Sequence, residues 1–243
     1  MKPITIASLC LAAVASAGAV ATAVTAEGAP AHRASAGVQA AHFAHPKPNP
    51  YYPLVPGTVT RLRGTDSGEH LHERVTVTHR TRMIQGVRTR VVHDVLFRAD
   101  GSVAEKTQDW YADDSGGNVW YFGEHTATYN RNGHVDSREG SWEAGVKGAT
   151  PGVIMPASPK PTDAYRQEYW RGHAEDQAWI VQNHASVRTP HRVFHRVVRS
   201  FEWTRLEPNV VSVKFYARGV GIVVEKDVAG GSEEFRLVSV SRP

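Results

Sequence analysis

The sequence predicts an all-β domain in which about ten strands form an antiparallel meander with one long irregular loop. Alternating runs of β-favouring residues recur along the chain, turn sequences rich in Gly, Asn and Asp separate them, and no run has the period of a convincing amphipathic helix. Strands joined by short turns pair antiparallel. Because this many strands rarely form a flat open sheet, we expect a barrel or a two-layer sandwich.

The N-terminus has the composition of an export signal. Lys2 precedes an apolar, Ala-rich segment at residues 4–24, and a run of small residues ends at Ala26. We interpret residues 1–26 as a cleaved signal peptide rather than a membrane anchor, because the segment is rich in small residues and is flanked by a single Lys. We therefore expect the mature protein to be secreted, extracellular and without a membrane span.

Residues 27–48 contain Ala, Ser, Pro and His with little apolar periodicity. This composition predicts a disordered linker, followed by a single β domain over residues 49–243. The only cysteine, Cys10, lies within the signal segment. The mature domain is therefore expected to have no disulfide and to be stabilised by its core alone.

The first half of the domain is predicted to consist of strands joined by hairpin turns. Gln85-Gly86 and Asp100-Gly101 mark two of the turns, because these residue types tolerate positive φ. The expected strands are residues 57–63, 74–82, 87–97, 102–112 and 119–129.

Residues 140–163 interrupt the pattern with four Gly and four Pro. A loop of this length in a compact domain is expected to be functional or to fold back as a lid. Residues 175–183 fit either a strand or a helix, and Gly219 and Gly221 predict a kink or bulge. The later strands are expected at residues 165–171, 192–206, 210–216, 222–228 and 234–240.

Seven short motifs occur in order along the domain. They are DWYA (109–112), GNVWYFGE (117–124), GSWEAG (140–145), PGVIMPA (151–157), YRQEY (165–169), AED (174–176) and GVG (219–221). As a set, they resemble a family of exported, β-rich bacterial domains found mainly in actinobacteria, with no assigned activity. The resemblance covers roughly residues 49–240 and implies export and a fold, but it implies no reaction.

The charge pattern argues against a nucleic-acid partner. The chain has 28 Lys and Arg against 24 Asp and Glu, a formal net charge of +4, and no run of five basic residues. Nucleic-acid binding requires a clustered basic patch. The expected partner is instead a small apolar molecule or a glycan.

Three carboxylates are candidates for acid or base catalysis: Asp109, Glu124 and Glu168. Residues 109–124 are predicted to form a hairpin that is rich in Trp and Tyr, and Asp109 and Glu124 lie at its open ends. Apolar neighbours there would raise the pKa values of both carboxyl groups. Two carboxylates at a suitable separation could hydrolyse a glycoside. The structural alternative is that these acids are exposed or paired with Arg.

Aromatic and apolar residues of the same region are candidates for the walls of a binding site, because planar rings stack on sugars and line apolar cavities. Arg166 is the candidate charge partner of the carboxylates. The structural alternative for most of the aromatic residues is core packing. The candidate ligand-binding residues are Tyr111, Trp120, Phe122, Trp142, Met155 and Arg166.

The sequence supports neither a metal nor a cofactor. His70 with His72, and His191 with His195, could bind Zn²⁺, but neighbouring Arg residues would repel a cation and no established metal motif is present. Glycine-rich phosphate loops and the Gly-x-Ser-x-Gly nucleophile motif are also missing.

These observations predict an exported β domain that binds an apolar or amphipathic ligand, or a glycan, in a cavity or cleft. Two alternatives stay open: a hydrolase or lyase that uses paired carboxylates, and a structural or interaction domain of the cell envelope. The alternatives differ in whether the site contains an apolar cavity, converging carboxylates or an exposed apolar patch.

Overall fold

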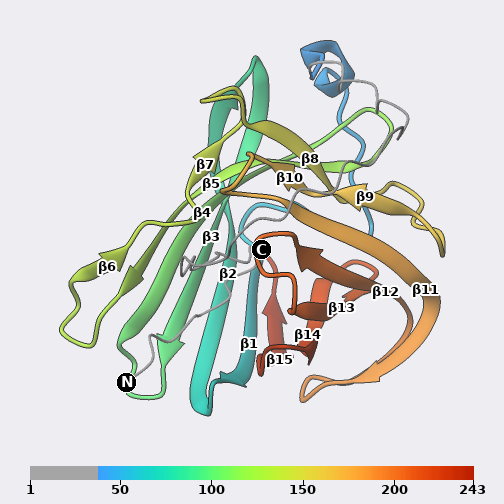
Figure 1. Cartoon of the computed structure of the whole chain (residues 1–243). Coiled ribbons are helices and arrows are strands. Elements are labelled where there is room, and N and C mark those ends of the chain that lie inside the picture. The colour runs from blue at the N-terminus through green and yellow to red at the C-terminus, as the bar shows by residue number, and fades with distance from the viewer. Residues whose placement is uncertain (1–37) are drawn as a thin grey trace, which may run out of the picture.

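The computed structural model describes residues 38–243 (Figure 1). The strands of this region form a 15-stranded sheet, and every pairing within it is antiparallel, which confirms the predicted all-β class. The expected signal peptide and most of the expected linker lie outside the described residues. Within residues 38–243, we find no helix that is both long and apolar enough to cross a membrane.

The first five strands form the predicted meander of hairpins (Figure 1). Gln85 and Gly86 both have positive φ, 48° and 77°, as the predicted turn requires. The strands are β1 (Val59–Asp66), β2 (Glu69–Ile84), β3 (Val87–Arg98), β4 (Val103–Asp113) and β5 (Val119–Tyr129).

The segment predicted to be a long irregular loop contains two short strands that extend the sheet. These are β7 (Trp142–Glu143) and β8 (Thr150–Met155), which pair with β5, as does the preceding β6 (Val135–Ser137). Without these short strands, the outer edge of β5 would have unpaired backbone N–H and C=O groups, and the short strands form hydrogen bonds with them. The prediction that residues 140–163 fold back as a lid is therefore wrong for β7 and β8, which belong to the sheet itself.

The C-terminal half continues the sheet, and β15 pairs with β1, which joins the two halves. Residues 175–183, which fitted a strand or a helix, belong mainly to a strand. The remaining strands are β9 (Ala164–Arg166), β10 (Glu168–Tyr169), β11 (Asp176–Arg188), β12 (Val193–Thr204), β13 (Val211–Ala217), β14 (Gly221–Ala229) and β15 (Glu234–Ser241).

A kinked segment, residues 164–169, nearly closes the sheet into a barrel. Its first part, β9, pairs with β11 at one end of the sheet, and its second part, β10, pairs with β8 at the other end. At the kink, the backbone N–H of Gln167 donates to the carbonyl of Asp176 at 2.8 Å. The single strand expected over residues 165–171 is therefore divided, because its two parts bond to opposite ends of one sheet.

The folded region begins before the predicted boundary at Asn49. The short 3₁₀ helix η1 (Ala40–Phe43) places the ring of Phe43 against Phe122, with ring centroids 5.5 Å apart. The backbone N–H of Lys47 also donates to the carbonyl of Asp114 at 2.9 Å. The predicted linker therefore does not extend through residues 40–48.

Asn49 attaches this N-terminal segment to the barrel. Its buried Nδ2 donates to the carbonyls of Gly117 and Pro156 at 2.8 and 3.0 Å. Its Oδ1 accepts a hydrogen bond from the backbone N–H of Tyr51 at 2.8 Å. These contacts hold the following residues, 52–54, against the sheet.

Candidate functional site

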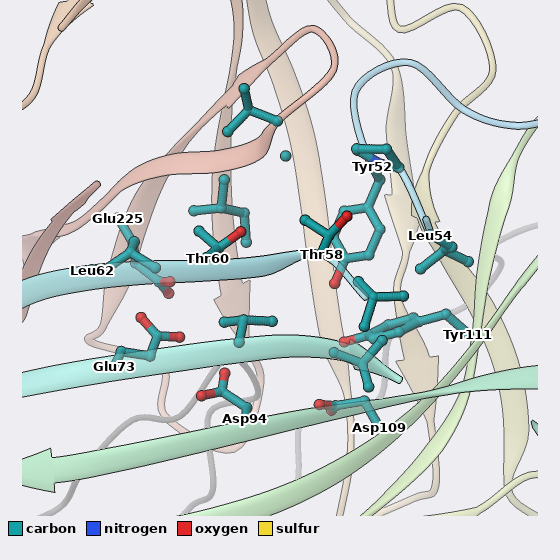
Figure 2. Close-up of a pocket in the computed structure, with 17 residues that line it drawn as sticks. Tyr52, Leu54, Thr58, Thr60, Leu62, Glu73, Asp94, Asp109, Tyr111 and Glu225 are labelled. Carbon is teal, nitrogen blue, oxygen red and sulfur yellow. The ribbon is translucent and has the colours of Figure 1, made fainter. Parts of the chain in front are cut away.

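A partly enclosed cavity of about 60 Å³ lies between residues 52–54, the inner face of β1 to β4, and the turn from β13 to β14 (Figure 2). Leu62 and Val77 are buried in its wall, whereas Leu54 and Ile222 are half-buried. A cavity of this size accommodates several water molecules or a small chemical group.

The strand register brings polar side chains into this apolar wall. Val75 on β2 lies opposite both Thr60 on β1 and Asp94 on β3. Asp109 on β4 lies opposite Val92 on β3. Residues directly opposite one another in a sheet share a face, so the two acids point into the barrel with the valines.

Four carboxyl groups line the cavity: Glu73, Asp94, Asp109 and Glu225. Figure 2 shows Glu73, Asp94 and Asp109 on neighbouring strands, on the side of the sheet that faces Tyr52. The lining contains no Lys, Arg or His. Apart from the hydroxyl groups of Thr and Tyr, the polar side chains of the cavity are therefore all acidic.

Burial raises the pKa values of all four carboxyl groups. Desolvation raises the pKa of Glu73 to about 8. Desolvation, reinforced by the carboxylate of Asp94, raises the pKa of Asp109 to about 8 as well. The pKa of Asp94 is raised well above its usual range by burial, by the charge of Glu73 and by a hydrogen bond shared with Glu73.

Glu225 is also paired with a buried cation. Lys214 Nζ lies 3.0 Å from Glu225 and 3.3 Å from Glu202, and all three residues are buried. Burial raises the pKa of Glu225 although Lys214 opposes that shift. Glu202 also accepts hydrogen bonds from the hydroxyls of Tyr216 and Ser200, at 2.6 and 2.7 Å. This network accounts for the charge of Lys214.

Two polar atoms of the cavity lining lack a hydrogen-bond partner in the part of the chain that the structure describes. They are Oγ1 of Thr58 and Oδ2 of Asp94, in residues that are 6% and 4% exposed. Apart from the hydrogen bond that Asp94 shares with Glu73, no described donor reaches its Oδ2. Buried polar atoms are normally hydrogen-bonded, so each of these two atoms marks a position where a bound molecule or water would be stabilised. The two positions are separate, because Thr58 lies beside Val77 whereas Asp94 lies opposite Val75.

The predicted catalytic candidates do not converge on one cavity. Asp109 lines the cavity and accepts a hydrogen bond from the hydroxyl of Tyr121 at 2.8 Å. Glu124 lies opposite Asp109 in the sheet but lines a separate, more open depression. Glu168 is buried and lines neither space, and its pKa is raised well above its usual range by burial and by Asp176.

Only one of the predicted ligand-binding residues lines the cavity, namely Tyr111. Phe122 and Met155 are fully buried in the main core cluster. Trp120 packs on Phe43 and donates a hydrogen bond to Asp114 at 2.9 Å. These three side chains therefore pack in or against the core, as the structural alternative predicted.

Arg166 is exposed, and its guanidinium lies 4.2 Å from the ring centroid of Tyr169. The prediction that Arg166 is the charge partner of the carboxylates requires Arg166 and Glu168 to lie on one face of the strand expected over residues 165–171. That expectation is wrong because the kink at Gln167 turns Glu168 inward while Arg166 stays in solvent.

The open depression, about 450 Å³, contains three tryptophans: Trp110, Trp142 and Trp170. Each ring is already packed against another group. Arg82 lies over Trp110 at 4.3 Å, the ring of Tyr121 meets Trp142 edge-on at 5.4 Å, and His173 stacks on Trp170 at 3.9 Å. The depression therefore presents little free aromatic surface for stacking on a sugar.

Sequence reasoning missed Glu73, Asp94 and Glu225. Two of them carried a detectable signal: Glu73 lies between Leu71 and Val75 at alternate positions of one strand, and Asp94 lies between Val92 and Leu96 of the next. An acid at a position that should be apolar marks a buried polar site.

Within residues 38–243, no three His, Cys, Asp or Glu side chains are arranged to hold a metal ion. His191 stacks near Phe194 at a centroid distance of 6.2 Å, and Nδ1 of His195 lies 2.9 Å from the hydroxyl of Ser186.

Comparison with known proteins adds little to this description. No protein-family model and no curated protein matches the chain. A solved structure from Bacteroides fragilis NCTC 9343, described as a proposed exported protein with a YmcC-like fold, is 15% identical, with a TM-score of 0.46 over 82% of this chain and 100% of that one. A proposed lipoprotein from Parabacteroides distasonis ATCC 8503 is 11% identical, with a TM-score of 0.44 over 80% of this chain and 100% of that one. The family resemblance of the motifs stays a prediction.

Proposed function

We propose that this protein is an exported binding module that holds a small amphipathic molecule in the cavity below residues 52–54. The observation that carries the proposal is a partly enclosed, apolar-walled cavity in which Thr58 and Asp94 each have an unpartnered buried oxygen. Ligand sites in proteins combine this kind of apolar lining with a few convergent polar groups. Export follows from the expected signal peptide.

The cavity supports an amphipathic ligand better than a glycan. Its wall is mainly aliphatic, whereas the three tryptophans of the open depression are covered by other side chains. Acid–base catalysis has less support, because the candidate carboxylates Asp109, Glu124 and Glu168 do not meet in one space. The interaction-domain alternative requires a large exposed apolar patch, and no observation on this structure favours one over the cavity.

Blocking the cavity tests the proposal. Val75 lines the cavity and is half-buried, so Val75→Phe should fill much of the space. The matched control is Val228→Phe, at a residue that is 52% exposed and does not line the cavity. Both variants are first checked for the far-ultraviolet circular dichroism of the wild type.

Binding is then measured by isothermal titration calorimetry with six-carbon probes that differ in head group: 1-hexanol, hexylamine and hexanoate. We expect at least one probe to bind the wild type and Val228→Phe equally, and to bind Val75→Phe at least tenfold more weakly. If no probe binds the wild type, or if Val75→Phe binds as well as the wild type, the cavity is not the binding site.

A further inference from the structure

We propose that the ligand of this cavity carries a primary ammonium group, so that the protein selects short alkylammonium ions over neutral or anionic molecules of the same length. This inference rests on the proposed function and identifies the chemical class of the ligand. It follows from the charge of the cavity, the unpartnered oxygen of Asp94 and the size of the cavity.

Charge complementarity is the first argument. The cavity lining contains four carboxyl groups and no cationic side chain. Buried Lys214, the one cation among the main influences on Glu73, is shared between Glu225 and Glu202. The buried guanidinium of Arg98 donates to the carbonyls of Val103 and Tyr129, both at 2.6 Å. The Glu73 and Asp94 pair therefore has no cation of its own among the described residues.

The electrostatic surroundings of this pair are acidic on nearly every side. Asp94 is influenced by Glu105 on β4 and by Glu225 on β14. Glu73 is influenced by Glu225 and by Glu233, which precedes β15, and Lys214 on β13 is the one opposing charge acting on it among its main influences. A cation that entered the cavity would therefore meet several carboxyl groups that can ionise to neutralise it.

In the free protein, protons perform the neutralising role that a bound cation would take over. Burial holds the pKa of Glu73 at about 8, so this carboxyl is mainly neutral at pH 7. When an ammonium ion enters, one carboxyl of the Glu73 and Asp94 pair loses its proton to solvent and becomes the carboxylate partner of the ammonium. One cation enters and one proton leaves, so the charge of the cavity is conserved.

The unpartnered oxygen of Asp94 selects the type of cation. Oδ2 of Asp94 can accept a hydrogen bond, and a primary ammonium has three N–H donors. A quaternary ammonium has none and is bulkier at the nitrogen. Charge-assisted hydrogen bonds are also stronger than neutral ones, which favours an ammonium over a hydroxyl at this position.

The size of the cavity sets the shape of the ligand. About 60 Å³ accommodates an ammonium and the first carbons of a chain. Leu54 and Ile222, which are half-buried at the cavity, are apolar and would contact the rest of an unbranched chain. A short unbranched alkylamine satisfies these requirements.

The test compares hexylamine with 1-hexanol and with hexyltrimethylammonium, by calorimetry between pH 6 and pH 8.5. Hexylamine stays protonated over this range, as a lysine side chain does. We expect its affinity to rise with pH below about 8, by up to tenfold per pH unit, because binding releases about one proton. Titrations in buffers of different ionisation enthalpy should detect that proton directly. The affinity for 1-hexanol should not rise with pH, and hexyltrimethylammonium should bind at least tenfold more weakly than hexylamine.

Two conservative variants test whether Glu73 and Asp94 bind the ammonium group. Glu73→Gln and Asp94→Asn should each weaken hexylamine binding at least tenfold, remove most of the proton release, and weaken the binding of hexylamine more than that of 1-hexanol. Glu139→Gln changes an exposed acid outside the cavity and should leave both probes unaffected.

The outcomes separate the two proposals. If 1-hexanol binds as tightly as hexylamine, with no pH dependence for either, the binding module stands and the ammonium inference is overturned. Tight binding of hexanoate in place of hexylamine would likewise overturn the ammonium inference and leave the binding module standing. If no probe binds the wild type, both proposals fail.

Discussion

At the scale of single residues, the molecule is unusual in the number of acids on the inner face of its sheet. Glu105, Glu202 and Glu225 are all buried, and they are compensated in two ways. Thr126 donates to Glu105 at 3.1 Å, whereas Lys214 neutralises Glu202 and Glu225. Buried charges persist in proteins only when they are paired, hydrogen-bonded or protonated, and this interior uses all three devices.

Lys214 is therefore expected to be the most sensitive single position of the interior. Lys214→Met should lower the free energy of unfolding by about 3–5 kcal/mol, because it leaves buried carboxylates without their cation. Lys226→Met is the matched control: Lys226 lies 2.8 Å from Glu234, but its side chain is 47% exposed. The control should cost less than about 1 kcal/mol.

Urea unfolding followed by tryptophan fluorescence measures both variants. Adding Glu225→Gln to Lys214→Met should recover part of the lost stability, because one uncompensated charge is removed. Similar losses for Lys214→Met and Lys226→Met would contradict the role assigned to the buried cation.

At the scale of elements, two contacts hold the barrel and its cavity together. One is the attachment of the N-terminal segment through Asn49, and the other is the closure of the sheet through residues 164–169. The first connects parts of the chain that are far apart in sequence, and the second connects the two ends of the sheet.

Removal of the Asn49 side chain should release the segment that covers the cavity. Asn49→Ala deletes hydrogen bonds to Gly117 and Pro156 and leaves buried carbonyls without donors, at a cost of about 2–4 kcal/mol. Limited proteolysis within residues 38–54 should become faster than in the wild type. Asn132→Ala, in an exposed turn, serves as control and should change neither property. An unchanged cleavage rate in Asn49→Ala would show that the segment is held by other contacts.

Gly152 permits the closure of the sheet. A Cβ at this position would collide with the backbone of Arg166 and Gln167, and the neighbouring backbone cannot yield as a flexible side chain does. Gly152→Ala should therefore cost about 3 kcal/mol, in the upper part of the range for overpacking.

Gly133→Ala is the comparison variant for this closure. Gly133 has a φ of 78° and no heavy atom within 4 Å of an added Cβ, so only backbone strain of about 1 kcal/mol is expected. Thermal unfolding followed by circular dichroism measures both. The proposed close approach is wrong if Gly152→Ala proves no more costly than Gly133→Ala.

At the scale of the whole molecule, the protonated acids should make stability depend on pH in an uncommon direction. The pKa values of Glu73 and Asp109 are raised to about 8 in the folded protein, from ordinary values of 4.5 and 3.8. Between these limits the folded state holds more protons than the unfolded state. The free energy of unfolding should therefore fall as pH rises from about 4 to about 8, by up to about 1.4 kcal/mol per pH unit for each group.

Groups with lowered pKa values act outside this window. Glu202 has a lowered pKa because Lys214 and its hydrogen bonds outweigh burial, so its contribution is lost only at acidic pH. Urea unfolding at pH 5, 6, 7 and 8 measures the slope. Asp109→Asn should reduce that slope, whereas Asp136→Asn, at an exposed position, should not. Stability that rises from pH 5 to pH 8 would contradict the protonated interior.

The sequence by itself determined the local features of this protein. The turn at Gln85-Gly86, the hairpin from β4 to β5 and most strand positions were predictable, because side-chain alternation and turn chemistry depend on neighbouring residues. The acids Glu73 and Asp94 were also detectable as interruptions of an apolar face, although we did not single them out.

Only the tertiary structure decided which of these features meet. Alternation assigns each side chain to one of two faces, but it does not say which face is inside or which strands become neighbours. The pairing of β8 with β5 and the kink at Gln167 could not be predicted, because both depend on which edges of the sheet the chain meets, and alternation does not specify those edges. The cavity depends on the same long-range geometry: its acids come from β2, β3, β4 and β14, and they share one space because the sheet curls upon itself.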